Sequence, residues 1–215
     1  MAAQMTALSI MQDAPVIPVI VLHNAEHAVP MAKALLAGGI RVLEVTLRTP
    51  QGLACIEAIA KQLPEAIVGA GTVRNAADAA AAARAGARFA VSPGYTSKLG
   101  QACRDLNLPL LPGVATSSEI MMAQEDGFTE LKFFPAVQSG GIQMLKAWQG
   151  PFGELRFCPT GGISPGNAAE FLALSNVVCV GGSWLVPASA VESGNWSLIT
   201  ELAQATQALR SSRTA

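Results

Sequence analysis

Short apolar segments alternate with longer, helix-like segments along the whole chain. The first apolar segment, residues 15–21, is rich in β-branched residues, as is typical of a strand buried on both faces of a parallel sheet. The helical segment that follows is alanine-rich, and the glycine pair at 38–39 ends it. The pattern predicts strands over residues 15–21, 41–46, 66–70, 88–91, 108–111, 129–134, 155–158 and 177–180. It predicts helices over residues 25–37, 50–62, 75–85, 96–106, 117–126, 141–148, 165–174 and 196–209.

Eight strand–helix units in succession predict a parallel sheet, and their even spacing favours closure into a single (β/α)8 TIM barrel. A doubly wound open sheet is the alternative. The chain of 215 residues shows no linker or low-complexity segment, so we expect one domain over residues 1–215. Residues 1–13 are expected to form an extra N-terminal helix that plugs the barrel bottom. Residues 210–215 form a polar tail that we expect to be frayed.

Composition narrows the function classes. Apolar residues make up 51% of the chain and charged residues 13%, which allows a large core. A net charge of −1 without a basic cluster argues against nucleic acid or anionic membrane surfaces as partners. No apolar run approaches the roughly 18 residues of a membrane span, and no secretion signal is recognisable. Because the four cysteines lack CxxC spacing, we expect reduced thiols in a cytoplasmic protein.

Lys132 is the most informative residue for chemistry. It lies among leucine and phenylalanine in the segment TELKFFP, residues 129–135. A buried ammonium group is costly unless it is paired or neutralised, and burial favours the neutral amine. A neutral amine can attack a carbonyl and form a Schiff base. The alternative is a lysine at a strand end whose head group reaches water.

Further candidate residues lie at the ends of the predicted strands, where barrels carry their active sites. Glu44 lies on a core strand and is the acidic residue placed for general acid–base work, unless it only pairs with Arg48 or Lys132. The Arg48 guanidinium suits a planar carboxylate, with a surface ion pair as the alternative. Thr72, after a glycine-rich turn, can serve the same carboxylate or cap the next helix. Pro93 and Phe134 are expected to form pocket walls.

Glycine pairs follow the last two predicted strands. Loops at these positions commonly bind phosphate in barrels through backbone N–H groups, which predicts a phosphate site at Gly161, Gly162, Gly182 and Ser183. Ordinary turn glycines are the alternative. Thr160 is expected to touch the substrate chain. His23 and His27 have a metal-compatible spacing but lack a third ligand, so we expect a solvated helix start and no metal.

Seven motifs together resemble a known family: EVTLRT at 44–49, GAGTV at 69–73, SPG at 92–94, PGVATSSE at 112–119, KFFPA at 132–136, PTGGI at 159–163 and GGSW at 181–184. In order, and over nearly the whole chain, they are similar to those of the KDPG/KHG aldolases. The resemblance implies a class I lyase of the Entner–Doudoroff pathway that cleaves 2-dehydro-3-deoxy-6-phosphogluconate to pyruvate and glyceraldehyde 3-phosphate. It also implies cleavage of 4-hydroxy-2-oxoglutarate to pyruvate and glyoxylate.

The resemblance further implies a homotrimer without cofactor or metal. It assigns Schiff-base chemistry to Lys132, proton transfer to Glu44 and pyruvate binding to Arg48, Thr72 and Lys132. Two other functions stay open from the sequence. A phosphosugar isomerase or epimerase of the same fold needs phosphate loops and a carboxylate, but no buried lysine. A catalytically silent phosphate-binding barrel needs neither Glu44 nor Lys132. The relative preference for the phosphorylated substrate also stays open.

Overall fold

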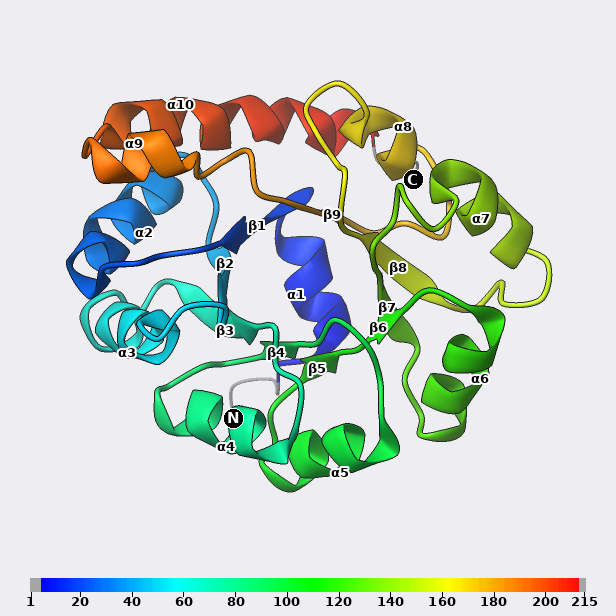
Figure 1. Cartoon of the computed structure of the whole chain (residues 1–215). Coiled ribbons are helices and arrows are strands. Elements are labelled where there is room, and N and C mark those ends of the chain that lie inside the picture. Colours follow the sequence, from blue (N-terminus) through cyan, green and yellow to red (C-terminus); the bar gives the residue numbers. More distant parts are fainter. Residues whose placement is uncertain (1–4, 213–215) are drawn as a thin grey trace.

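The computed structural model describes residues 5–212 and has an α/β fold, in which parallel strands curl around the middle of the molecule and the helices after the first lie outside them (Figure 1). Six strands pair in the order β5-β4-β3-β2-β1-β9, and three more pair in the order β6-β7-β8. The strands are β1 Val16–Ile20, β2 Val42–Thr46, β3 Ile67–Gly71, β4 Ala90–Val91, β5 Leu110–Leu111, β6 Gly113–Val114, β7 Glu130–Phe133, β8 Arg156–Pro159 and β9 Val180–Gly182.

The helices follow the strands in the predicted alternation. They are α1 Ala7–Asp13, α2 Ala28–Ala37, α3 Gly52–Gln62, α4 Ala76–Arg84, α5 Ser97–Asp105, α6 Ser117–Glu125, α7 Gly141–Trp148, α8 Ala168–Leu172, α9 Ala188–Glu192 and α10 Trp196–Gln207. The short helix α9 was not predicted. The predicted strand at 177–180 is displaced toward the C-terminus, because Val177 makes only an isolated bridge to Phe157 and the continuous pairing with β1 begins at Val180.

The two sets of strands approach each other at both margins. Only Pro112 separates β5 from β6, and proline has no N–H group to donate to a ladder. At the other margin, isolated parallel bridges join Phe157 to Val177 and Thr160 to Gly181. The sheet is therefore strongly curled, and its two groups of strands face one another around a common interior.

Helix α1 packs against the interior from the side where the strands begin. Its residues Ile10 and Met11 belong to a buried cluster with Ile17, Val42 and Phe89 from the strands. Thr6 caps this helix by accepting a hydrogen bond from the Ser9 N–H, at 3.1 Å. Of the predicted N-terminal helix, residues 1–4 lie outside the described residues. The opposite side, where the strands end, is thus the side left for a site.

The chain continues as a short helical turn after α10. Residues Ala208–Ser212 form a 3-10 helix, and the Arg210 side chain donates to the Asp13 carbonyl at 2.9 Å and to Gln207 Oε1 at 2.8 Å. A long arginine side chain thus reaches the end of α1, and fraying of the polar tail stays a prediction. Residues 213–215 lie outside the described residues. Between residues 5 and 212, no helix combines the length and apolar character needed to cross a membrane.

Candidate active site

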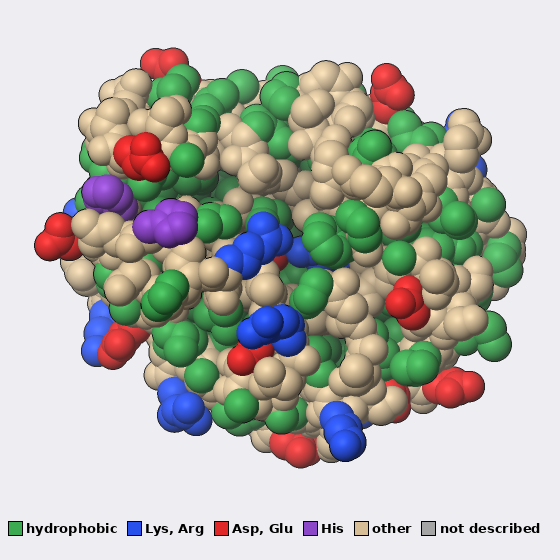
Figure 2. All heavy atoms as spheres, in the orientation of Figure 1, with side chains coloured by type: hydrophobic (Ala, Val, Ile, Leu, Met, Phe, Trp, Pro, Cys, Tyr) green, Lys and Arg blue, Asp and Glu red, His purple; other side chains and the backbone are tan. Residues whose placement is uncertain are grey.

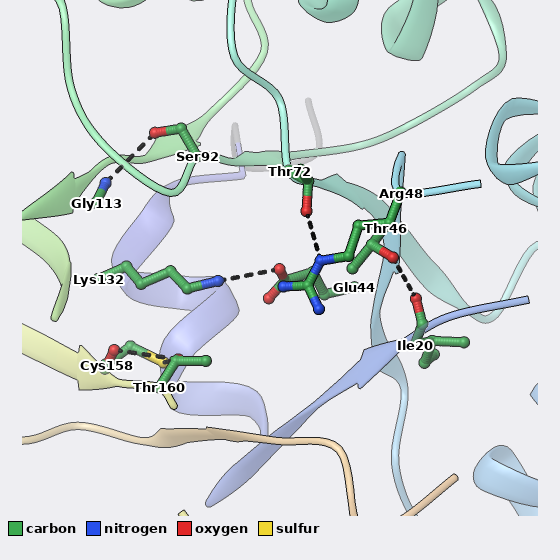
Figure 3. A network of polar contacts seen from close by, with 10 residues as sticks. All are labelled: Ile20, Glu44, Thr46, Arg48, Thr72, Ser92, Gly113, Lys132, Cys158 and Thr160. Atoms are coloured by element: carbon green, nitrogen blue, oxygen red, sulfur yellow. Dashed lines mark hydrogen bonds and ion pairs between the residues drawn. The ribbon is translucent and has the colours of Figure 1, made fainter. Parts of the chain in front are cut away.

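Lys132 and Glu44 form a buried ion pair in the interior (Figure 3). The Lys132 Nζ donates to Glu44 Oε1 at 3.2 Å, and each side chain is only 4% exposed. Lys132 lies on β7 and Glu44 on β2, so the pair bridges the two groups of strands. The alternative in which the lysine head group reaches water is wrong. Of the two pairing partners considered for Glu44, Arg48 and Lys132, the structure has Lys132, and general acid–base work by Glu44 stays a prediction.

The alternating direction of strand side chains explains why this lysine is buried. Its neighbours Leu131 and Phe133 belong to the core between strands and helices, so Lys132 points to the opposite side, into the interior. There its Nζ lies 5.3 Å from the centre of the Phe134 ring, within the range of a cation–π contact. The charge of the amine is balanced by Glu44.

The geometry is suited to proton transfer coupled to nucleophilic attack. A general base must lie within about 2.6–3.2 Å of the group whose proton it takes, or one water away. The Glu44 carboxylate meets that distance with respect to the Lys132 amine. Transfer of a proton from the ammonium to the carboxylate leaves a neutral amine, which is the form that attacks carbonyl carbon.

Arg48 and Thr72 meet at the rim of this interior. The Arg48 Nε donates to Thr72 Oγ1 at 3.2 Å, so a threonine rather than a carboxylate is its hydrogen-bond partner. Thr72 has a left-handed backbone with φ of 61°, in the turn after β3. The helix-cap alternative for Thr72 is wrong, because the Asn75 side chain caps α4 by accepting from the Asp78 N–H.

A groove beside the ion pair is lined by most of the remaining predicted residues. Its lining comprises Val19, Arg48, Phe134, Thr160, Gly161, Gly162, Ile163, Gly181, Gly182 and Ser183. Lys and Arg side chains gather over the middle of the same face of the molecule in Figure 2. Pro93 lies elsewhere: it is exposed after β4, next to Ser92, whose Oγ accepts from the Gly113 N–H at 3.3 Å. The sequence prediction missed Val19, on β1, and Ile163, in the loop after β8, since an apolar residue that can pack in the core gives no separate signal for a ligand.

The groove glycines have conformational and packing reasons to be glycine. Gly161 and Gly162 have left-handed backbones with φ of 98° and 76°, which side chains disfavour. A Cβ on Gly162 would also lie 2.7 Å from the Val137 Cβ, and one on Gly182 would collide with the Trp184 ring. The turn-glycine alternative therefore accounts for these residues without a ligand. Phosphate binding by the groove stays a prediction.

Thr160 is a buried polar residue in the groove wall. Its Oγ1 donates to the Cys158 carbonyl at 3.4 Å and lies 3.9 Å from the Cys158 sulfur. Cys158 pairs in register with Lys132 across β7 and β8. Thr160 lies two residues further along, on the same face and closer to the side where the strands end. The Thr160 hydroxyl is therefore held by long contacts beside the Lys132 position.

Neither histidine lines the groove, and among the cysteines Cys158 contacts Thr160. The His27 ring packs edge-on against Trp196, with centroids 5.9 Å apart. All four cysteines are buried outside disulfides, and burial raises the pKa of the Cys103 thiol to about 11. Over the described part of the chain, no three His, Cys, Asp or Glu side chains are grouped as a metal site requires.

The sequence and structure match known proteins throughout. A family described as KDPG and KHG aldolase matches residues 8–202. A relative named KHG/KDPG aldolase from Escherichia coli (strain K12) is 56% identical over 199 residues, which is 93% of each chain. A second relative, from Dickeya dadantii and named 2-dehydro-3-deoxy-phosphogluconate aldolase, is 55% identical over 93% of each chain.

Solved structures of related proteins superpose closely on this chain. The KDPG aldolase from Legionella pneumophila, with pyruvate captured as a covalent carbinolamine intermediate, superposes with a TM-score of 0.92. It is 50% identical, over 94% of this chain and 98% of that one. The aldolase of Zymomonas mobilis with 3-phosphoglycerate has a TM-score of 0.87 and 46% identity, over 94% of each chain. This chain therefore belongs to the KDPG and KHG aldolase family.

Proposed function

We propose that this chain is a class I aldolase that cleaves 2-dehydro-3-deoxy-6-phosphogluconate to pyruvate and glyceraldehyde 3-phosphate. The observation that carries the proposal is the buried pair of Lys132 and Glu44, with 3.2 Å between amine and carboxylate. Cleavage of 4-hydroxy-2-oxoglutarate to pyruvate and glyoxylate by the same residues is proposed as a second activity. The Escherichia coli relative, whose name includes both substrates, supports it.

Lys132 and Glu44 divide the chemistry between them. The neutral Lys132 amine attacks the C2 ketone, and loss of water from the carbinolamine gives a protonated imine. The imine draws the electron pair of the C3–C4 bond as Glu44 takes the proton from the C4 hydroxyl, and the aldehyde leaves. Glu44 then returns a proton to C3 of the enamine. Hydrolysis of the pyruvate imine frees Lys132.

Arg48 and Thr72 are proposed to bind the carboxylate of the keto acid. The guanidinium has further N–H donors beyond the Nε that binds Thr72, and a planar carboxylate can accept two of them. Phe134, which touches the Lys132 amine and lines the groove, forms a wall against the reacting carbons. Thr160 is proposed to contact the substrate chain, and Pro93 to limit the pocket from the β4 side.

The phosphate is proposed to bind at the far end of the groove, near Gly161, Gly162, Gly182 and Ser183. Support comes from their shared position in the groove that also contains Arg48 and Phe134. The related Zymomonas mobilis structure holds 3-phosphoglycerate, a phosphorylated acid of similar chemistry. The glycine conformations are compatible with amides that face a ligand, although they do not require one.

We also propose that the two groups of strands form one closed (β/α)8 barrel, in a single domain with α1 as the plug. The continuity of the chain at Pro112 and the bridges from Phe157 and Thr160 support closure. A homotrimer is proposed on family membership alone. Sedimentation equilibrium of the purified protein distinguishes a trimer from a monomer or a dimer.

Trapping with borohydride separates the proposal from an isomerase or epimerase. Reduction of the enzyme with pyruvate present is expected to add the pyruvate-derived mass permanently to the peptide that contains Lys132. The variant Lys132→Met should gain none, whereas Lys98→Met, at an exposed lysine, should label like the parent. A folded parent enzyme that gains no mass, or that is labelled on another lysine, contradicts the proposed nucleophile.

A further inference from the structure

Gly71 adjoins the Glu44 carboxylate at the end of β3. A Cβ built on Gly71 collides with Glu44 Oε1 and would lie 2.7 Å from its Cγ and 2.9 Å from its Cδ. The oxygen that it would strike is the one that accepts the hydrogen bond from Lys132. The absent side chain of Gly71 therefore leaves the space in which this oxygen lies.

Strand register explains the contact. Glu44 pairs with Gly69, and Thr46 pairs with Gly71, so Gly71 lies two residues beyond the direct partner of Glu44 on the same face. The Glu44 side chain leans along the strand, toward the end where the strands terminate, and occupies the space above Gly71. From that position it reaches Lys132 on β7.

Backbone conformation does not account for this glycine. Gly71 lies in a regular parallel strand and does not have a positive φ. An alanine can therefore adopt the same dihedral angles. Gly69 on the same strand makes a useful contrast, because a Cβ there would meet the Phe89 ring instead of a carboxylate. One glycine makes room for a core aromatic residue, and the next makes room for the proposed acid–base group.

We propose that Gly71 is a positioning residue that determines where the Glu44 carboxylate lies relative to the reacting amine. The proposal rests on the proposed function, since it assumes that Glu44 moves protons. A methyl group at this position displaces Oε1 from Lys132 and leaves the fold of β3 intact. Activity is then lost through misplacement of a group that is still present.

The test is a double-mutant cycle of Gly71→Ala with Glu44→Asp, read as deuterium exchange at the methyl group of pyruvate. In the parent background, Gly71→Ala is expected to slow exchange about 10²-fold, the lower range for lost general acid–base catalysis. Aspartate is shorter by one methylene and withdraws from the added methyl group. In the Glu44→Asp background, the same substitution should therefore slow exchange less than about threefold, a coupling that only neighbouring residues show.

Gly100→Ala is the control, because a Cβ there would meet Tyr95 and Phe128 instead of Glu44, and its effect should be the same in both backgrounds. Equal losses from Gly71→Ala in both backgrounds would overturn the positioning role. If Gly71→Ala does not fold, recovery of folding by added Glu44→Asp still supports the contact, and failure of both variants overturns it. Glu44→Gln with parent-like exchange would instead overturn the proposed role of Glu44 itself, so the two failures are distinguishable.

Discussion

The Lys132 amine lies 3.2 Å from a carboxylate oxygen of Glu44, although their strands belong to different hydrogen-bonded groups. The two strands, β7 and β2, share no backbone ladder, so the pair exists only because the sheet curls until its inner faces oppose each other. Each side chain satisfies the charge of the other where water is largely excluded. The site and the curvature of the fold are therefore coupled.

The first prediction concerns Lys132→Met. We expect complete loss of cleavage and of borohydride trapping, because the variant has no amine at this position to form the imine. We also expect lower stability, since the buried Glu44 loses its cation. Breaking a buried pair by removing one partner typically costs about 3–5 kcal/mol. Urea unfolding followed by circular dichroism measures this loss.

The double variant Lys132→Met/Glu44→Gln tests the origin of that loss. It removes both charges, so it should be more stable than Lys132→Met alone. Equal stability of the single and double variants would show that the unpaired Glu44 carboxylate does not destabilise Lys132→Met. Retained trapping in Lys132→Met would assign the nucleophile to another lysine.

The pair also shows where sequence reasoning reaches its limit. A buried lysine among Leu131 and Phe133 indicates a need for a partner, but local sequence does not say which carboxylate meets it. Glu44 is 88 positions away, and a choice between Arg48 and Lys132 as its partner requires the strand arrangement. Removing a lone buried amine would raise the stability of the protein, whereas removing the paired amine found here is expected to lower it.

Secondary structure was more predictable than such contacts, because strand and helix patterns are local. Helix α7 begins and ends where the pattern placed it, at Gly141 and Trp148. Other features have tertiary causes: β9 begins late because Val180 pairs with β1, and Arg210 contacts Asp13 at the end of α1. In both cases the two contacting segments are far apart in the sequence, so no local pattern signals the contact.

The second prediction concerns Glu44→Gln. Glutamine preserves shape and can still accept a hydrogen bond from Lys132, but it cannot accept a proton. Imine formation should continue slowly, while turnover falls by about 10²–10⁴-fold, as for lost general acid–base catalysis. Deuterium exchange at the pyruvate methyl group is the direct measurement. Exchange at the parent rate would mean that water or another residue is the base.

The third prediction uses the contact between Tyr95 and Asp126, which links the start of α5 to the end of α6. The Tyr95 hydroxyl donates to Asp126 Oδ2 at 2.6 Å, and this bond is the main reason that the pKa of Asp126 is lowered. A lowered carboxyl pKa stabilises the fold above the unfolded value of about 3.9, and this contribution is lost as pH falls through the folded value.

Tyr95→Phe should therefore lower the melting temperature at pH 7, with a difference from the parent that shrinks as pH falls below about 4. Thermal melts of both proteins between neutral and acidic pH provide the measurement. Asp126→Asn is the control, since it removes the titrating carboxyl itself. Its difference in melting temperature from the parent should also shrink as pH falls. A difference that stays constant with pH would mean that the tyrosine acts through packing alone.

Glycines at a rim show a second limit of sequence reasoning. The pairs at 161–162 and 181–182 suggest a phosphate loop, but left-handed backbone at Gly162 and the Trp184 ring beside Gly182 require glycine anyway. Substitution at either glycine disturbs the backbone or the packing before any ligand binds. Ser183 is the better probe, because it is exposed and lines the groove without such a constraint.

The last prediction concerns Ser183→Ala. The substitution removes one hydroxyl donor to a charged acceptor, worth about 1.5–3 kcal/mol. We expect kcat/KM for the phosphorylated substrate to fall about tenfold to a hundredfold. Cleavage of 4-hydroxy-2-oxoglutarate should change much less, because that substrate has no phosphate. Ser189→Ala, on the exposed side of α9 and outside the groove, should leave both activities unchanged. An equal loss on both substrates in Ser183→Ala would show that the hydroxyl supports the groove wall and not the phosphate.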